Sequence, residues 1–551
     1  MGTFALTLTV AVNSDGGKFP RIFNLRPLDW LLTILNSGTT EAFCANECQP
    51  AFGTCGTATS SSTSISAPTP SSISSTLQDC LDTKDVPVYF PTTSGFTQLA
   101  EPFNLRLTYI PAVVVLPTTI QHISDAVICA GTYHVKVQAK SGGHSYASFS
   151  SGGQNGSMIV DLGSFQNIEV DPSGVAEIGG GVRLGDMALS IYNGSQRALP
   201  QGTCPGIGIG GHATHGGFGS TSRQWGLTLD TILGLDVVIA NGTSIHVTAD
   251  DYPDLWYALR GAADSFGIIT TFYFDTVPAP SSIINFEYMI PGLYTSATDM
   301  TEAFLHIQAF ALNSSIIDGK IGFGVHLDGS TFTISGTYLG DLTTWGNILE
   351  PALLSGLPAP NSSTVGGNSW LDSLNLLAAP SSLHQPTQNL HDNFYAKSIL
   401  VPSSSPLTSA ALNNYFAYII ENGSSSQQPT PWFSDIHLYG GPGSAINTPP
   451  SNASAYSDRD ALWLVQHYGN MTDTNEPFPA ELSFIDGLNA ALTDAMPDTT
   501  FGAYLNFVDP ELSPSEAHEI YYGSTTYDRL VAIKRTWDEG DLFWNPQSVG
   551  N

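Results

Sequence analysis

The chain has 551 residues, of which 42% are hydrophobic and 10% aromatic, so it is long enough to form more than one packed core. Charged residues make up only 12%, and the 54 glycines and 35 prolines are typical of a loop-rich α+β protein rather than a helical bundle or a disordered chain. Seventeen basic residues against 48 acidic ones give a net charge of −31, which excludes nucleic acid and an anionic membrane surface as partners.

Residues 1–56 are expected to form an N-terminal appendage, because a tract rich in Ser, Thr and Pro separates them from the rest. Within the appendage, the segment Phe43–Cys55 contains Cys44, Cys48 and Cys55 and resembles the closing part of hevein-type chitin-binding modules. The upstream cysteines of such modules are absent, so a short tail without a function is the alternative. The resemblance implies a truncated module that does not itself bind sugar, and an association with the cell wall is expected.

The tract itself, residues 57–76, has the composition of an O-glycosylated linker. No run approaches the roughly 18 apolar residues that span a bilayer, and the first residues lack the basic start of a signal peptide. Export is therefore predicted from the linker and from eight Asn-x-Ser/Thr sequons. These sequons begin at Asn155, Asn193, Asn241, Asn313, Asn361, Asn422, Asn452 and Asn470.

The residue pattern of the chain after the linker changes along its length. Residues 112–117, 158–162 and 232–240 are short and β-branched, which predicts buried strands, and 118–130 predicts a helix before a strand around Val135. Residues 281–499 carry longer helical patterns, more polar strands and Pro/Ser-rich loops. The segment 513–522 predicts a helix that begins with a Ser-Pro-Ser-Glu start signal.

Two glycine-rich segments, 139–149 and 201–219, contain the residues that carry chemistry. Dense glycines let backbone N–H groups approach a polyanion such as a diphosphate, although neither segment fits the dinucleotide fingerprint. One segment holds His144 and the other Cys204, and an imidazole nitrogen and a thiolate both add readily to an electron-poor flavin ring. A backbone-bonded loop histidine and a buried thiol are the alternatives.

Three further stretches, residues 254–270, 521–530 and 541–549, accompany these loops in the same order as in a known family. Together they resemble the berberine bridge enzyme-like and oligosaccharide oxidase branch of the vanillyl-alcohol oxidase (PCMH-type FAD-binding) flavoproteins. The resemblance implies an α+β fold with a two-subdomain FAD-binding domain over 77–280, completed by 500–551. It also implies an antiparallel-sheet substrate domain over 281–499, flanked by helices.

The same resemblance implies a bicovalent FAD, linked through His144 to the flavin 8α-methyl and through Cys204 to the flavin 6-position, and a disulfide between Cys80 and Cys129. A His-x-x-His pair, His212 and His215, lacks an accompanying ligand set, so no metal is expected. The other residues expected at the cofactor are Ser141, Gly142, Gly143, Ser145, Gly208, Gly210, Gly211, His212, Gly216, Gly217, Gly219, Gly267, Ile269, Tyr504 and Asn506.

The catalytic base departs from the family pattern. Sugar-oxidising members typically use a Tyr in a Tyr-x-Asn-Tyr stretch, paired with an Asp that precedes a Gly-Gly; here the stretch ends in Phe507, and His437 stands where the acid usually lies. A neutral imidazole accepts a proton near working pH, so we predict His437 as the base. His467 and His215 are further candidates and Tyr504 an assisting one. A structural histidine is the alternative for each.

The predicted function is an FAD-linked oxidase that takes hydride from an alcohol carbon of a natural product or phenolic, with oxygen as the acceptor. Ile207 stands where family oxidases tend to carry Val, so a dehydrogenase with poor oxygen reactivity is one alternative. Another is an oligosaccharide oxidase that forms lactones at the anomeric carbon. The third is a catalytically idle binding protein at the cell wall.

Overall fold

The structure is a computed structural model that describes residues 71–384, 391–471 and 478–550, all within the compact unit Thr39–Asn551. The predicted appendage and its three cysteines lie outside the described residues. Helix α3 (Ser71–Asp82) begins inside the tract predicted as a linker, so the linker prediction extended too far at its C-terminal end. No helix among the described residues is long and apolar enough to cross a membrane.

A four-stranded sheet opens the fold, in the strand order β1-β2-β4-β3, with β1 antiparallel to three parallel strands. Its strands are β1 (Val88–Tyr89), β2 (Val113–Val115), β3 (Val137–Lys140) and β4 (Met158–Asp161). Helix α5 (Ile120–Thr132) connects β2 to β3, and the Thr119 side chain caps its first turn. The Cys80–Cys129 disulfide joins α3 to α5, as the family resemblance implied.

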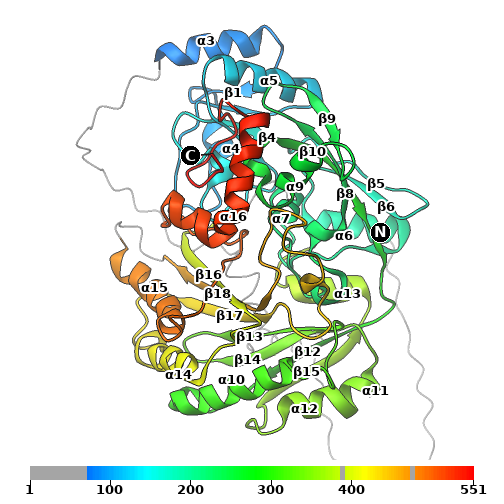
Figure 1. The fold of residues 1–551 in the computed structure, drawn as a ribbon, viewed down its shortest axis with the longest axis vertical. Helices are drawn as coiled ribbons and strands as arrows, with labels where there is room; N and C mark the ends of the chain where they lie inside the picture. The colour runs from blue at the N-terminus through cyan, green and yellow to red at the C-terminus, as the bar shows by residue number, and fades with distance from the viewer. Residues whose placement is uncertain (1–70, 385–390, 472–477, 551) are drawn as a thin grey trace, which may run out of the picture. The chain divides into compact units, whose positions relative to one another are not determined.

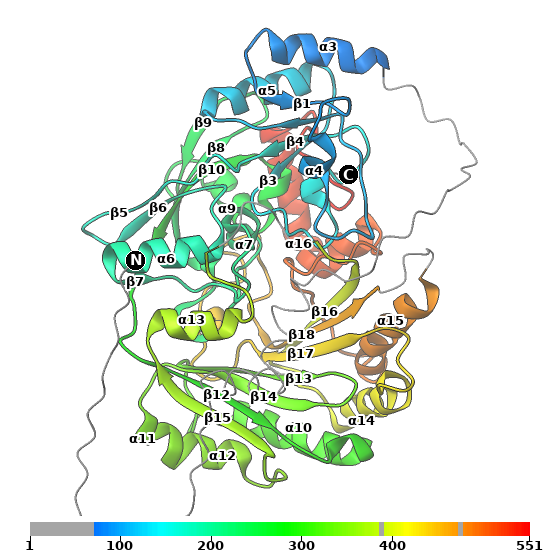
Figure 2. The ribbon, with the colours of Figure 1, turned by 180° about the vertical axis from the view of Figure 1, so that it is seen from behind.

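A five-stranded antiparallel sheet follows, in the order β5-β6-β10-β8-β9. Helices α6 and α9 lie in the same part of the ribbon as these strands, as Figures 1 and 2 both show. The strands are β5 (Ile168–Val170), β6 (Val175–Gly179), β8 (Ile232–Val238), β9 (Ser244–Val247) and β10 (Ile268–Asp275). The accompanying elements are α4 (Phe96–Ala100), α6 (Leu184–Ser195), α7 (Ile209–Thr214), α8 (Ser222–Trp225), α9 (Pro253–Ala262), β7 (Arg197–Ala198) and β11 (Val277–Pro278).

The third large sheet has seven antiparallel strands in the order β15-β12-β14-β13-β17-β18-β16. Its strands are β12 (Ile283–Met289), β13 (Ile321–Leu327), β14 (Phe332–Tyr338), β15 (Ser362–Asn368), β16 (Phe394–Pro402), β17 (Trp432–Leu438) and β18 (Ala461–Asn470). This sheet falls within the span predicted as the substrate domain, and the predicted α+β class is confirmed. The exact domain boundaries stay a prediction.

The two faces of the seven-stranded sheet have different neighbours, because side chains alternate along each strand. Val325, Ile436 and Val465 point to the face covered by helices and pack with Phe304 and Leu488 in one apolar core. Residues next to them, such as His326 and Asp435, point to the opposite face, toward the glycine-rich segments 139–149 and 201–219. Figure 1 shows this arrangement, with the covering helices α10 (Ala297–Ala311), α12 (Glu350–Leu354), α14 (Ser409–Tyr418) and α15 (Pro479–Thr493). The smaller helices are α11 (Leu342–Thr344) and α13 (Trp370–Ala378).

The C-terminal segment returns to the first sheet. Helix α16 (Pro514–Trp537) begins with a reciprocal cap between Ser513 and Glu516, so the predicted start is confirmed, but the helix runs past the predicted end at 522. After it, the backbone N–H of Val137 in β3 donates to Leu542 at 2.9 Å. In Figure 2, α16 lies beside the first two sheets, far in sequence from the strands it accompanies.

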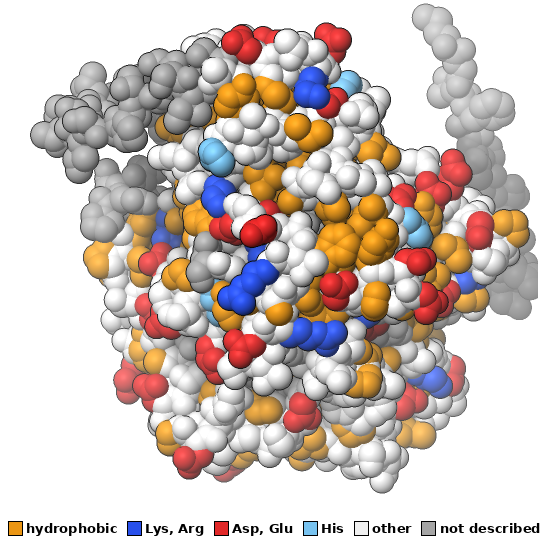
Figure 3. Space-filling model, turned by 45° about the horizontal axis from the view of Figure 1, so that its top comes forward, with side chains coloured by type: hydrophobic (Ala, Val, Ile, Leu, Met, Phe, Trp, Pro, Cys, Tyr) orange, Lys and Arg blue, Asp and Glu red, His pale blue; other side chains and the backbone are white. Residues whose placement is uncertain are grey.

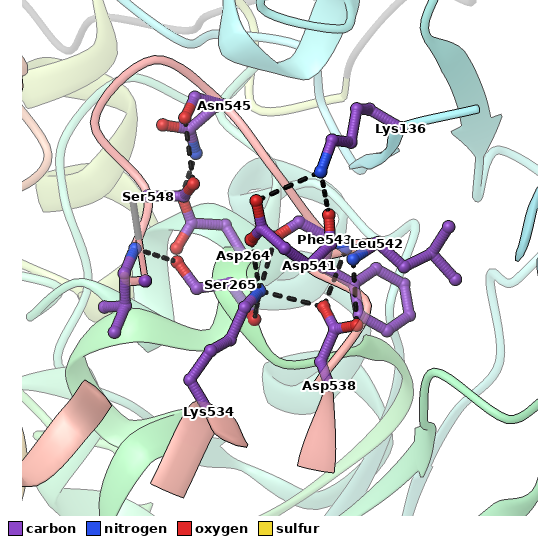
Figure 4. A network of polar contacts seen from close by, with 12 residues as sticks. Lys136, Asp264, Ser265, Lys534, Asp538, Asp541, Leu542, Phe543, Asn545 and Ser548 are labelled. Atoms are coloured by element: carbon purple, nitrogen blue, oxygen red, sulfur yellow. Dashed lines mark hydrogen bonds and ion pairs between the residues drawn. The ribbon is translucent and has the colours of Figure 1, made fainter. Parts of the chain in front are cut away.

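Two buried basic side chains, Lys534 and Arg223, hydrogen-bond to segments that are distant in sequence. The Lys534 ammonium donates to the carbonyls of Ser265 and Phe543 and to the Asp538 carboxylate, at 2.6–2.8 Å, as drawn in Figure 4. The Arg223 guanidinium donates to carbonyls at the ends of β13 and β17, among them Gly440 at 2.9 Å. Each cation is at most 3% exposed, so each is held by directed bonds rather than by solvent.

The surface matches the acidic composition. Figure 3 shows acidic side chains spread over the face it draws, with basic side chains fewer among them. The basic side chains lie close to acidic ones and form no broad positive area on this face. Such a surface keeps the chain away from polyanions.

Replacing Lys534 with Met should destabilise the protein by about 3–5 kcal/mol, because the Asp538 carboxylate would stay buried without its cation. Denaturant unfolding followed by tryptophan fluorescence measures the change. Lys320→Met is the matched control, since Lys320 makes a 3.9 Å ion pair in which both side chains are about half exposed, and it should change little. Equal stability of Lys534→Met and wild type would contradict this role.

Candidate functional site

A cavity opens where the glycine-rich loops face the seven-stranded sheet. Its walls come mainly from five stretches far apart in sequence, within residues 138–150, 202–223, 322–336, 435–438 of β17 and 504–508. One wall is therefore loop backbone rich in N–H groups, and the other is the uncovered face of the sheet. The arrangement is suited to a flat cofactor held by the loops with a substrate between it and the sheet.

The two loops approach each other more closely than side chains would allow. A Cβ built on Gly142 would lie 2.3 Å from the Gly208 nitrogen, and one built on Gly208 would lie 2.0 Å from the Gly142 nitrogen. The Ser141 hydroxyl donates to the Gly180 carbonyl at 2.6 Å and accepts from the Gly210 N–H at 3.2 Å. These contacts bring the backbones of the two loops together at the cavity wall, and such glycine-rich backbone fits a diphosphate held without lysines.

His144 and Cys204 both line this cavity. The His144 ring stacks on Phe103, with centroids 4.3 Å apart. Burial, with smaller effects from Arg183 and His391, lowers the pKa of His144 to about 3, so its imidazole is neutral at any working pH. A neutral imidazole is the nucleophilic form, and the Cys204 sulfur, only 2% exposed, lies beside Ile207. The donor set therefore fits a flavin.

The C-terminal segment holds the second glycine-rich loop in place. The Tyr504 hydroxyl accepts from the Gly217 and Phe218 N–H groups at 3.0 and 2.8 Å, and Asn506 donates to two carbonyls of the same loop. Burial raises the pKa of Tyr504 above its ordinary value. Tyr504 lines the cavity, but its hydroxyl is engaged with the loop, which makes it a positioning group rather than a proton acceptor.

His212 and His215, the His-x-x-His pair, each contact another part of the protein through a ring nitrogen. The His212 Nε2 accepts from the Gly202 N–H at 3.1 Å, and burial lowers the pKa of His212 to about 4. His215 Nε2 lies 3.3 Å from Asp264; burial lowers the pKa of His215, but the Asp264 carboxylate outweighs it and leaves the pKa raised. Both rings line the cavity. In the described part of the chain, no group of three or more His, Cys, Asp and Glu is arranged to hold a metal ion.

The remaining predicted cofactor residues divide into two sets. Five of them do not line the cavity: Gly216 and Gly217 have φ of +118° and +82° in the loop turn, while Gly210 lies against Ser141, Gly267 against Val237 of β8 and Ile269 against Gly180. The predicted residues that do line it are Ser141, Gly142, Gly143, His144, Ser145, Cys204, Gly208, Gly211, His212, Gly219, Tyr504 and Asn506.

The two histidines predicted as bases in the sheet lie on opposite faces of it. His437 lines the cavity and lies over Gly324 of the neighbouring strand, where a Cβ would be 2.7 Å from its Nδ1. Burial lowers the pKa of His437. His467 instead faces the covering helices, with its Nδ1 2.7 Å from Ser434 and its ring 5.7 Å from Tyr415. The structure therefore contradicts a direct catalytic role for His467, because strand alternation turns it away from the cavity.

Sequence analysis missed a pair on the cavity face of the sheet. His326 in β13 and Asp435 in β17 are direct cross-strand neighbours, and His326 Nδ1 lies 2.8 Å from Asp435 Oδ1. Both side chains line the cavity and are at most 5% exposed. The two residues are 109 positions apart, and only the register of β13 against β17 brings them together. A histidine within the otherwise apolar run of β13 was the one available signal.

Comparison with known proteins places this geometry in a family. Residues 111–248 match the model for an FAD binding domain, and residues 503–550 match the model described as berberine and berberine like. A xylooligosaccharide oxidase of Thermothelomyces thermophilus is 35% identical over 482 residues, which cover 86% of this chain and 94% of that protein. The FAD-linked oxidoreductase dpmaF of Metarhizium anisopliae is 34% identical, over 85% of this chain and 90% of its own.

A solved structure agrees with both sequence matches. The glucooligosaccharide oxidase of Acremonium strictum, described with a 6-S-cysteinyl, 8α-N1-histidyl FAD, superposes with a TM-score of 0.80 at 30% identity. The superposition covers 86% of this chain and 99% of that one. The chain belongs to the berberine bridge enzyme-like family of FAD-linked oxidoreductases. It is thus an FAD-dependent oxidase acting on a small molecule, and the predicted resemblance is confirmed.

Proposed function

We propose that this family member oxidises the anomeric carbon of an oligosaccharide to a lactone and passes the electrons on to oxygen. The observation that carries the proposal is the cavity, in which loops suited to FAD face a polar sheet surface formed by His326, Ser335, Asp435 and His437. The similarity to oxidases of xylo- and glucooligosaccharides over nearly their whole length supports a sugar as the substrate. This replaces the natural-product alcohol as the first choice.

Each wall of the cavity has a separate task in this reaction. The glycine-rich loops donate N–H groups to the cofactor diphosphate, and Tyr504 and Asn506 keep the second loop in position. When bound, FAD supplies the acceptor for the hydride that leaves the sugar carbon. The sheet face holds the sugar and must supply a group that takes the hydroxyl proton, because Phe507 has no ionisable atom.

A panel of xylo-, gluco- and chitooligosaccharides tests the function directly. Sugars should reduce the bound FAD under anaerobic conditions, and peroxide should form when air is admitted. If phenolic or other natural-product alcohols reduce the FAD and sugars do not, the natural-product oxidase expected from the sequence is correct. If a dye accepts electrons and oxygen does not, the chain is a dehydrogenase, as expected if Ile207 hinders oxygen. If nothing reduces the FAD, the proposal fails.

The cofactor is proposed to be attached through His144 and Cys204. The supporting observations are the neutral imidazole and the buried sulfur in one cavity, together with the doubly linked FAD of the similar glucooligosaccharide oxidase. Each bond replaces one hydrogen on the flavin and one on the side chain. Forming it therefore releases two electrons, which an external oxidant such as oxygen must remove.

Acid-precipitated wild-type protein should retain its yellow colour, and peptide mapping should find the flavin on peptides containing His144 and Cys204. His144→Ala and Cys204→Ala should each keep one linkage, and the double variant should release all FAD. His212→Ala is the control, because His212 lines the cavity but bonds to Gly202, so both linkages should persist. Wholly extractable FAD in the wild type would refute the attachment.

Secretion is also proposed, and the sequons support it. Asn155, Asn193, Asn241, Asn361 and Asn452 are exposed, while the Asn470 amide donates to the buried Asp392 carboxylate at 2.9 Å. An association with the cell wall stays a prediction, because residues 1–56 lie outside the described part of the chain.

Protein secreted from a eukaryotic host should carry N-glycans at the exposed Asn241, Asn361 and Asn452 and none at Asn470, whose side chain is half-buried and whose nitrogen lies against the buried Asp392 carboxylate. Glycopeptide mass spectrometry before and after enzymatic deglycosylation measures the occupancy of each site. Retention of unglycosylated protein inside the cell would count against secretion, and a fully occupied Asn470 would show that this sequon is not restricted by the fold.

A further inference from the structure

The cavity face of the seven-stranded sheet holds a histidine whose second nitrogen has no partner. His326 Nδ1 lies 2.8 Å from Asp435 Oδ1, so in the neutral ring Nδ1 carries the hydrogen and Nε2 carries the lone pair. The ring is 5% exposed, and Nε2 has no hydrogen-bond partner among the described residues. A ring that lines the cavity, is oriented by a carboxylate and keeps a buried nitrogen lone pair without a protein partner has the parts that proton abstraction requires.

The surroundings hold this ring in place from several sides. The ring of Phe433 is 5.8 Å from the His326 ring and nearly parallel to it, and Thr333 lies directly opposite His326 on β14. A buried nitrogen without a partner has lost its hydrogen bonds to water, so the fold keeps this arrangement at the expense of stability. A substrate hydroxyl that donated to Nε2 would recover that cost on binding.

The other groups at the site are less suitable as proton acceptors. Phe507 has no ionisable atom, and the Tyr504 hydroxyl already accepts two backbone N–H groups. His467 lies on the opposite face of the sheet. His437 shares the cavity, but burial and the neighbouring His326 both lower its pKa and weaken it as a base, despite an opposing effect of Asp435.

We propose that the His326–Asp435 pair is the catalytic base of this enzyme, in place of the tyrosine that Phe507 removes. The inference rests on the proposed function only in requiring an alcohol or hemiacetal hydroxyl as substrate. The hydroxyl proton goes to His326 Nε2, and the hydrogen on the same carbon leaves as hydride to the flavin with two electrons. The substrate C–O bond becomes C=O, and oxygen or an added dye afterwards takes up the two electrons that left with the hydride. Asp435 stabilises the resulting imidazolium.

The pH dependence distinguishes His326 from His437, the two histidines on the sheet wall of the cavity. Burial lowers the pKa of His326, but Asp435, with smaller effects from Asp328 and Glu287, outweighs it and leaves the pKa above 6.5. The neutral ring is the active form, so flavin reduction should be fast above this pKa and fall as the pH drops through it. If His437 were the base, the fall would come below 6.5, because its pKa is lowered.

The kinetic test uses holoprotein and whichever sugar or alcohol reduces wild-type FAD in the anaerobic panel. His326→Gln should slow flavin reduction by about 10²–10⁴-fold and leave covalent FAD content unchanged. Asp435→Asn should slow flavin reduction less than His326→Gln does. It should also shift the fall in rate to lower pH, because the anion that raises the pKa of His326 is removed. Added imidazole should partly restore His326→Ala. These effects do not follow from a merely structural role.

Two matched controls make the test specific. His467→Gln changes a buried histidine of the same sheet on the helix-covered face, and it should reduce FAD at close to the wild-type rate. His437→Gln changes the other histidine on the sheet wall of the cavity and should slow flavin reduction less than His326→Gln does. The proposal is overturned if His326→Gln, with full FAD content, is reduced as fast as wild type, or if only His437→Gln is slow.

A second readout does not depend on turnover. Long-range ¹H–¹⁵N spectra of histidine-labelled protein, with the His326 signal assigned by its loss in His326→Gln, should show an Nδ1-protonated ring that titrates above 6.5. The opposite tautomer, or titration below 6.5, would contradict the proposed base. If no substrate in the panel reduces the wild type, the proposed function fails, while this spectrum still decides whether the pair is formed as described.

Discussion

The bonds from the Tyr504 hydroxyl to the Gly217 and Phe218 N–H groups are the interaction on which the cavity depends. They join a residue near the C-terminus to a loop almost 300 positions earlier, and Asn506 reinforces them through two carbonyls of the same loop. A glycine-rich loop has many accessible backbone conformations, so it needs such external bonds to present its N–H groups in one geometry. Lys534 fastens the same C-terminal segment to Ser265 on the other side. The chain therefore completes its cofactor site only when its last fifty residues have packed.

Strand alternation decides which polar residues of the seven-stranded sheet take part in chemistry. Asp435 and His437 are two apart on β17 and share the cavity face with His326, whereas His467 pairs with Ser434 on the face that packs against α14. The glycines of β13 matter for the same reason, since Gly324 leaves room for the His437 ring. The side chains on the sheet wall of the cavity are thus determined by the two-residue repeat of each strand and by the register between β13 and β17. Arg223 attaches the ends of these two strands to the loop side of the cavity.

Local patterns in the sequence were sufficient for much of the fold and for one wall of the site. The β-branched runs at β2, β4 and β8, the capped start of α16 and the glycine-rich loops with His144 and Cys204 are all encoded by neighbouring residues. The opposite wall could not be predicted in this way. His326 and Asp435 are joined by strand register alone, and the sidedness of His467 depends on where β18 begins its alternation. Gly267 and Ile269, which lie against β8 rather than in the cavity, likewise take their places from the pairing of β10 with β8.

A crystal structure of the FAD-loaded enzyme with a sugar product or lactone analogue would test the central claim most directly. The claim is that the flavin lies between the two loops and the sheet, and that His326 receives the proton of the oxidised hydroxyl. The account predicts that the ligand oxygen lies about 2.6–3.2 Å from His326 Nε2, with Nδ1 still bonded to Asp435. A ligand oxygen bonded to His437 or Tyr504, with His326 out of reach, would contradict it.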